Sequence, residues 1–262
     1  MNTVWDPAQY EAFGGERARP FRELVGRLDG PGPDPARVVD LGCGTGELTA
    51  TLAARWPDAV IDALDSSAEM IAEARRREIP GRLTFRVGDV AAWRPDGPVD
   101  LIVSNAVLQW VPEHFDLLPQ WMDALTPGGR LAFQVPGNFG EPSHVLLREL
   151  GRSDRWRGKL GALQRDAPVL DAAGYLDLLI RHGCAVDAWE TTYIQVLHGD
   201  DPVLEWVKGS ALRPVLSALD PGETEEFLDA YRERLRQAYP SAPYGTVFPF
   251  RRIFVIATRP DS

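Results

Sequence analysis

Three glycines at alternating positions follow an apolar stretch and an acidic residue near the start of this 262-residue chain. Residues 38–46 read VVDLGCGTG, so that Asp40 precedes Gly42, Gly44 and Gly46. Glycine allows a tight turn and lets a ligand come close to the bare backbone. The pattern therefore predicts a strand, a ligand-binding loop and a helix, which together open an α/β sheet.

The same loop argues against a dinucleotide ligand. The dinucleotide fingerprint requires G-x-G-x-x-G/A, and the two possible registers place Glu47 or Thr49 at the last small position. The carboxylate of Asp40 would also repel a pyrophosphate, whereas it suits a ligand that carries a positive amino group. S-adenosylmethionine (SAM), with its ammonium and sulfonium groups, is such a ligand.

Strands and helices alternate after the loop, which predicts a parallel sheet with helices on its faces. The expected strands are 37–42, 59–64, 82–88, 99–104 and 130–135, and the expected helices are 46–55, 67–78 and 114–125. The run from Asp89 to Pro98 is short, so it should hold a crossover with at most a vestigial helix.

We expect one domain over residues 1–262, because a chain of this length can bury one large core. At its start, Asp6-Pro7 predicts a short helix that ends near Gly14-Gly15, and a second helix should run from Pro20 to Leu28. The expected parts are an N-terminal helical arm (1–30), a ligand-binding core (36–136), two longer irregular or helical segments (137–182 and 199–245) and two β-rich runs (185–197 and 247–258).

Charge and cysteine content limit the partners that we expect. The chain has 28 basic and 38 acidic residues, a net charge of −10, which disfavours nucleic-acid phosphates and anionic lipid as partners. Two cysteines cannot form a disulfide scaffold or a zinc site by themselves, and the first residues do not read as a secretory signal. We therefore expect a cytoplasmic protein, with its oligomeric state left open.

The glycine loop and its companions resemble the class I SAM-dependent methyltransferases. That resemblance implies a Rossmann-like sheet that is mostly parallel, with an antiparallel C-terminal edge hairpin formed by 185–197 and 247–258. It also implies N-terminal helices and a helical cap formed by the insertions 137–182 and 199–245. It implies a cofactor site in which Asp65 and Ser66 face the ribose, Asp89 and Val90 the adenine, and Asn105 the methionine end. The loop residues of that site are Asp40, Gly42, Gly44 and Gly46. Two simpler readings stay open: Asp65 or Ser66 caps a helix, and Gly88-Asp89 is only a turn.

Further blocks resemble the family of trans-aconitate 2-methyltransferases and cover almost the whole chain. They lie at residues 5–20, 104–110, 134–149, 206–214 and 248–252. The resemblance implies that the chain forms a monomethyl ester of trans-aconitate or of a closely related small polycarboxylate. Two alternatives are a methyltransferase for another small organic acid and a non-catalytic SAM-binding regulatory protein.

The implied reaction asks little of the protein's own acid–base groups. A carboxylate with a pKa of about 4 is already ionised at neutral pH, so we expect no general base and no metal. Holding several carboxylates in an acidic protein does require local positive charge, a role that suits arginine. Each candidate could also have a purely structural role, such as a solvated helix face for Arg19. The candidate substrate residues are Arg19, Trp110, His144, Arg213 and Arg251.

Overall fold

A computed structural model describes residues 14–29, 33–163, 168–209 and 211–261. The chain forms two compact units. We name the described residues within 14–135, 169–191 and 253–261 the core unit, and the described residues within 136–168 and 192–252 the insertion unit. The strands β6 and β8 each contribute residues to both units.

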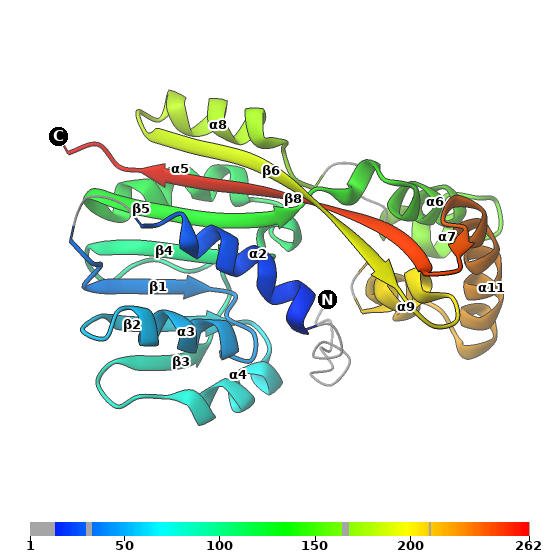
Figure 1. The fold of residues 1–262 in the computed structure, drawn as a ribbon, viewed down its shortest axis with the longest axis horizontal. Helices are drawn as coiled ribbons and strands as arrows, with labels where there is room; N and C mark the ends of the chain where they lie inside the picture. Colours follow the sequence, from blue (N-terminus) through cyan, green and yellow to red (C-terminus); the bar gives the residue numbers. More distant parts are fainter. Residues whose placement is uncertain (1–13, 30–32, 164–167, 210, 262) are drawn as a thin grey trace. The chain divides into compact units, whose positions relative to one another are not determined.

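The sheet has eight strands, and the order of its main path is β3-β2-β1-β4-β5-β8-β6 (Figure 1). Along this path, each neighbouring pair of strands from β3 to β5 is parallel. Strand β8 runs antiparallel to β5, because Gly128 bonds to Arg259 while Gly137 bonds to Arg251. The predicted mostly parallel sheet with antiparallel C-terminal strands is confirmed. The strands are β1 (Arg37–Leu41), β2 (Val60–Asp65), β3 (Leu83–Val87), β4 (Val99–Asn105), β5 (Leu125–Pro136), β6 (Ala185–Leu197), β7 (Ser241–Ala242) and β8 (Gly245–Thr258).

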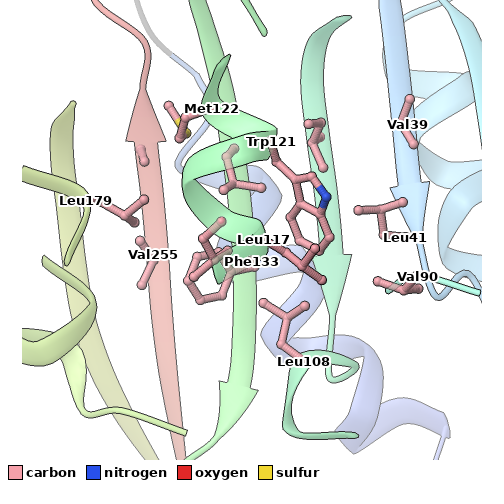
Figure 2. Packing of buried hydrophobic residues seen from close by; sticks show 14 of the residues in the cluster. Val39, Leu41, Val90, Leu108, Leu117, Trp121, Met122, Phe133, Leu179 and Val255 are labelled. Carbon is pink, nitrogen blue, oxygen red and sulfur yellow. The ribbon is translucent and has the colours of Figure 1, made fainter. Parts of the chain in front are cut away.

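Apolar side chains from the sheet and from two helices form the main core (Figure 2). Trp121 of α5 (His114–Ala124) and Tyr175 of α8 (Ala172–Arg181) are fully buried, and Phe133 and Val255 reach them from β5 and β8. The ring of Phe133 meets that of Tyr175 edge-on, 5.0 Å between centroids. Burial of a large side chain of this kind contributes roughly 1.5–3 kcal/mol, so this face holds the core unit together.

The helix α2 (Gly14–Gly26) covers the opposite face of the sheet (Figure 1). Its Glu23 accepts hydrogen bonds from the indole Nε1 of Trp189 (3.1 Å) and from the hydroxyl of Thr191 (2.7 Å), both on β6. Trp189 also stacks on Phe254 of β8. Phe254 is adjacent to Val255, a residue of the main core, and the side chains of adjacent strand residues point to opposite faces. The contacts of α2 therefore lie on the face of the sheet opposite the main core.

The core unit differs from the expectations in two places. The helix predicted from Pro20 begins earlier: α2 starts at Gly14 and continues through Pro20, because Phe21 and Leu24 are buried beyond it. The described segment 88–98 contains turns and no helix, which agrees with the short crossover expected from β3 to β4. The helix α8 belongs to the core unit, although the sequence places it in the cap insertion 137–182. The predicted helix from Asp6-Pro7 lies mainly outside the described residues.

Short helices make up most of the insertion unit, and α6 and α11 pack together in it. The hydroxyl of Tyr231 donates to the carbonyl of Ser143 at 2.6 Å, and the amide of Ser143 donates to the hydroxyl of Tyr239 at 3.0 Å. A capping box of Asp220 and Glu223 starts α11. The elements are η3 (Asn138–Gly140), α6 (Pro142–Gly151), α7 (Arg157–Leu160), η4 (Gly161–Leu163), α9 (Pro202–Lys208), α10 (Arg213–Leu216) and α11 (Pro221–Ala238).

Candidate functional site

The glycine loop lies where β1 ends and is bonded to the end of β2. The amides of Gly42 and Cys43 donate to the carbonyl of Leu64, at 2.8 and 3.0 Å. The amide of Gly44 donates to Oδ2 of Asp65 at 3.0 Å. The loop and the predicted ribose carboxylate are therefore side by side, at the carboxyl edge of a parallel sheet where open α/β folds bind ligands.

Two glycines of the loop are closed in by neighbouring side chains, and one is open. A Cβ on Gly42 (φ +85°) would lie 2.1 Å from Cγ2 of Val107, and one on Gly46 (φ +74°) would lie 2.7 Å from the ring of Phe85. Around Gly44, no heavy atom of the described residues lies within 4 Å of a Cβ position. The loop therefore packs tightly on two sides and leaves its backbone accessible at Gly44, which fits a bound cofactor.

Asp65 is held by backbone amides rather than used as a helix cap. Its Oδ1 accepts from the amide of Ser67 at 2.9 Å. The N-cap of α4 (Ala68–Ala74) is Ser67, whose hydroxyl oxygen accepts from the amide of Met70, so the reading of Asp65 or Ser66 as the cap is wrong. Burial raises the pKa of Asp65 above its ordinary value. The amide of Ser66 also acts on this carboxylate, and since a carboxylate can accept about four hydrogen bonds, Asp65 keeps some acceptor capacity for a ligand.

Asp40 lies in the interior beneath the loop. It is 3 % exposed, and the hydroxyl of Thr49 donates to its Oδ2 at 2.6 Å. Burial, together with a smaller effect of the negative charge of Asp65, raises the pKa of Asp40 to about 7, although the hydrogen bond from Thr49 acts to lower it. Sequence reasoning missed Thr49, which merely reads as a helix residue that breaks the dinucleotide fingerprint. Asp40 is therefore suited to act on a cationic ligand through its charge.

The remaining predicted cofactor residues lie at the ends of β3 and β4. The amide of Gly88 donates to the carbonyl of Asp65 at 2.9 Å, which brings the next residue, Asp89, beside the end of β2. Asp89 is exposed and closes a local turn by accepting from the amide of Ala91, whereas Val90 is buried. The turn reading of Gly88-Asp89 is thus correct, and a turn of this kind leaves the adenine role open as a prediction.

A strained turn follows β4. Ala106 has φ +58°, which is uncommon for a residue other than glycine. Its amide donates to the carbonyl of Gln134 (2.9 Å), and its carbonyl accepts from Nε2 of Gln109 (2.6 Å). Nε2 of Gln134 also donates to Oδ1 of Asn105 at 2.5 Å. Backbone strain that is held in place by surrounding residues is typical of binding sites. Gln109 and Gln134, which hold this turn, were not among the predicted site residues.

The candidate substrate residues are divided between the two units. Arg19, exposed on α2, and Trp110, half-buried in η2 (Leu108–Trp110), belong to the core unit with the whole predicted cofactor set. His144, Arg213 and Arg251 belong to the insertion unit. Arg213 begins α10 and is only 9 % exposed, so it does not lie on a solvated face.

His144 is a neutral side chain in this structure. Its Nδ1 lies 3.1 Å from the hydroxyl of Ser143, and its ring packs edge-on against Phe139. Burial and the positive charge of Arg148 lower the pKa of His144 to about 4. Anion binding by His144 through a protonated imidazole is therefore disfavoured at neutral pH. Donation of a neutral N–H remains available.

We expect the imidazole of His144 to titrate near pH 4 and to remain neutral around pH 7. Because its folded pKa lies below the unfolded value of 6.5, protonation opposes folding. The stability advantage over a His144→Asn variant should therefore shrink as the pH falls from 6.5 to about 4. NMR titration of the ring gives the pKa directly, and a midpoint near 6.5 would contradict this result.

No helix in the described part of the chain is both long and apolar enough to cross a bilayer. Among the same residues, no three His, Cys, Asp or Glu side chains are grouped so that they could hold a metal ion.

Comparison with known proteins places these features among methyltransferases. A family model described as a methyltransferase domain matches residues 38–129. The chain is 54% identical over 258 residues to the trans-aconitate 2-methyltransferase of Streptomyces avermitilis, which spans 97% of this chain and 96% of that protein. It is 51% identical to the protein of the same name from Rhodococcus jostii, over 97% of this chain and 99% of that protein.

A solved structure shares the fold at low sequence identity. It is phosphoethanolamine N-methyltransferase 2 of Haemonchus contortus, in complex with phosphomonomethylethanolamine and S-adenosylhomocysteine. The TM-score is 0.56 at 16% identity, and the match covers 96% of this chain but 56% of that longer chain. At this identity the likeness concerns the fold only.

Proposed function

The chain belongs to the trans-aconitate 2-methyltransferase family, and we propose that it transfers a methyl group from SAM to one carboxylate of trans-aconitate. The product is a monomethyl ester. The observation that carries the proposal is the glycine loop, open at Gly44 and bonded to the carboxylate of Asp65, in a chain about half identical to these enzymes along nearly its whole length. The predicted methyltransferase fold is confirmed by the family model and by the solved neighbour, and the S-adenosylhomocysteine in that neighbour's complex supports SAM as the methyl donor.

The residues at the strand ends are suited to hold SAM. Asp65 would accept from the ribose hydroxyls, with Ser66 beside it, and Asp89 with the amide of Val90 would bind the adenine. Asn105 would contact the methionine end, and the backbone of Gly42, Gly44 and Gly46 would let the cofactor approach closely. Asp40 would favour the ammonium group through its negative charge. When bound, SAM supplies an electrophilic methyl group.

The substrate carboxylate is already a nucleophile, so the protein's task is to position it. The oxygen, the methyl carbon and the sulfonium sulfur must be brought into line, and water must be kept from the oxygen. We propose that Arg19, Trp110, His144, Arg213 and Arg251 contribute to this, the arginines by binding carboxylates and His144 by donating a neutral N–H. Small anionic acids rather than nucleic acid or membranes are the proposed partners, and a cytoplasmic location stays a prediction from the sequence.

The decisive experiment measures turnover of methyl-labelled SAM with trans-aconitate and with a series of di- and tricarboxylic acids. We expect trans-aconitate to have the highest kcat/KM and to give one monomethyl ester, whose position NMR of the product identifies. Faster turnover of another acid would replace the proposed substrate. Binding of SAM with no turnover of any acid would indicate a non-catalytic SAM-binding protein.

Two pH dependences should separate binding from chemistry. With both substrates saturating, kcat should be flat from about pH 6 to 8, because no protein base is needed and carboxyl pKa values are about 4. The dissociation constant for SAM should instead fall as the pH rises through about 7, since Asp40 ionises there and its negative charge attracts the ammonium group. The change is up to about tenfold between pH 6 and 8.

Calorimetry at several pH values checks this, with Asp40→Asn as the matched variant. The variant should bind SAM with a pH-independent constant over the same range. A wild-type constant that does not change with pH would remove Asp40 from cofactor binding, and a kcat governed by one enzyme group near pH 7 would contradict the base-free mechanism.

A further inference from the structure

We propose that Asn138 binds a carboxylate of the substrate by donating a hydrogen bond from its side-chain amide nitrogen. The proposal rests on the proposed function and adds a substrate-binding residue to it. Asn138 opens η3, two residues after the end of β5 in the chain, and belongs to the insertion unit, as does Arg251, to which its side chain is bonded.

The orientation of the Asn138 amide is set by the backbone of a neighbouring strand. Its Oδ1 accepts from the amide of Arg251 on β8 at 2.7 Å. The amide of the preceding residue, Gly137, donates to the carbonyl of the same Arg251 at 2.9 Å. Since an N–H can bond only to the oxygen end of the asparagine side chain, these contacts determine which atom is Oδ1 and which is Nδ2.

The other end of this amide is buried without an acceptor. Asn138 is 1 % exposed, and Nδ2 has no hydrogen-bond partner among the described residues. More than nine in ten buried polar groups in native proteins are paired, because an unpaired one keeps its full desolvation cost. A donor that is rigidly held and unpaired is therefore well placed for an acceptor that a ligand brings.

The surroundings of η3 favour an anionic acceptor. Nη1 of Arg148 donates to the carbonyl of Phe139 at 2.6 Å, one residue after Asn138. The positive charge of Arg148 also lowers the pKa of His144, whose ring packs against Phe139. Positive charge and neutral N–H donors thus gather around one short turn in a protein of net charge −10. A carboxylate, which only accepts hydrogen bonds, is the group of trans-aconitate that matches them.

The test replaces the donor while it preserves the anchor. Asn138→Asp keeps an oxygen for the Arg251 amide but puts a second acceptor, with negative charge, where Nδ2 was. We expect KM for trans-aconitate to rise by roughly 10- to 100-fold, the loss typical of a hydrogen bond to a charged group. The dissociation constant for S-adenosylhomocysteine should change less than about twofold, since the substitution removes no predicted cofactor contact.

Gln237→Glu is the matched control. Gln237 is exposed on α11 in the same unit, so this change introduces the same charge by the same amide-to-acid replacement. It should leave KM for the acid unchanged. Asn138→Ala is the second variant, in which the donor is lost without added repulsion, and we expect a smaller rise in KM than with aspartate.

Analogues of trans-aconitate that lack one carboxylate identify the contact. If Asn138 binds a particular carboxylate, the effect of Asn138→Asp should vanish with the analogue that lacks it, as expected for two groups that interact. Wild-type turnover with unchanged KM in both Asn138 variants would overturn this inference and leave the proposed function intact. Loss of the fold in both, measured by thermal unfolding, would show a structural amide and also overturn it. Absence of wild-type turnover would instead reject the proposed function.

Discussion

A Gly42→Ala variant is expected to lose SAM binding and a large part of its folding stability. The new Cβ would lie 2.1 Å from Cγ2 of Val107, at a backbone φ of +85°. The left-handed conformation costs about 1–2 kcal/mol for alanine, and overpacking typically costs about 1–3 kcal/mol more. Relief of the clash must move either the glycine loop or the turn after β4, and both carry predicted cofactor residues. Calorimetry with SAM and denaturant unfolding measure the two losses.

Two further variants separate steric conflict from backbone strain. Gly81 has a similar φ of +74°, but no heavy atom of the described residues lies within 4 Å of a Cβ there. Gly81→Ala should therefore show only the conformational cost and retain SAM binding. Adding Val107→Ala to Gly42→Ala should restore part of the affinity, because the atoms closest to the new Cβ are removed. Normal SAM binding by the Gly42→Ala protein would show that the loop geometry is not needed.

The second large effect is expected for the acid substrate. Arg213→Ala should reduce kcat/KM for trans-aconitate by about 30-fold to several thousand-fold, since loss of a desolvated charge contact costs about 2–5 kcal/mol. Arg213 is 9 % exposed, and arginine is rarely buried unless acceptors surround its guanidinium group. Steady-state kinetics with each substrate varied in turn should show the loss in kcat/KM for trans-aconitate, whereas SAM binding should be nearly unchanged.

Arg213→Lys distinguishes a planar clamp from a simple charge. Lysine keeps the charge but loses the bidentate fork, so KM for the acid should rise if the contact is bidentate. Arg157→Ala is the control for removal of an arginine from the same unit, because Arg157 is exposed and pairs with Asp154. Parallel losses of both ligands together with a lower melting temperature would assign Arg213 a structural role. Normal acid kinetics in folded Arg213→Ala would move the clamp to Arg19, His144 or Arg251.

Local sequence patterns were sufficient for the parallel half of the fold. The alternation of apolar strands with amphipathic helices placed β1 to β4, α3 (Glu47–Arg55), α4 and α5 within a few residues, because each pattern reflects one buried face. They failed where tertiary burial overrode a local signal. Pro20 reads as a helix start, yet α2 runs through it because residues on both sides are buried. The strand β5 begins at Leu125, five residues before the predicted start at residue 130. The reason is that the backbones of Gly128 and Gly129 form hydrogen bonds with Arg259 instead of forming a turn that ends before the strand.

For the site, the sequence by itself determined the residue types that a SAM-dependent carboxyl methyltransferase needs, because glycine spacing and strand-end carboxylates are local properties. Only the tertiary structure decided the pKa values and the hydrogen-bond partners of these residues. Burial beside Asp65 brings the pKa of Asp40 to about 7, and burial beside Arg148 brings that of His144 to about 4. Ser67 as the cap of α4, and the amide nitrogen of Asn138 that has no partner among the described residues, likewise appear only in three dimensions. Desolvation and hydrogen-bond pairing depend on neighbours that are distant in the chain, and no local pattern records them.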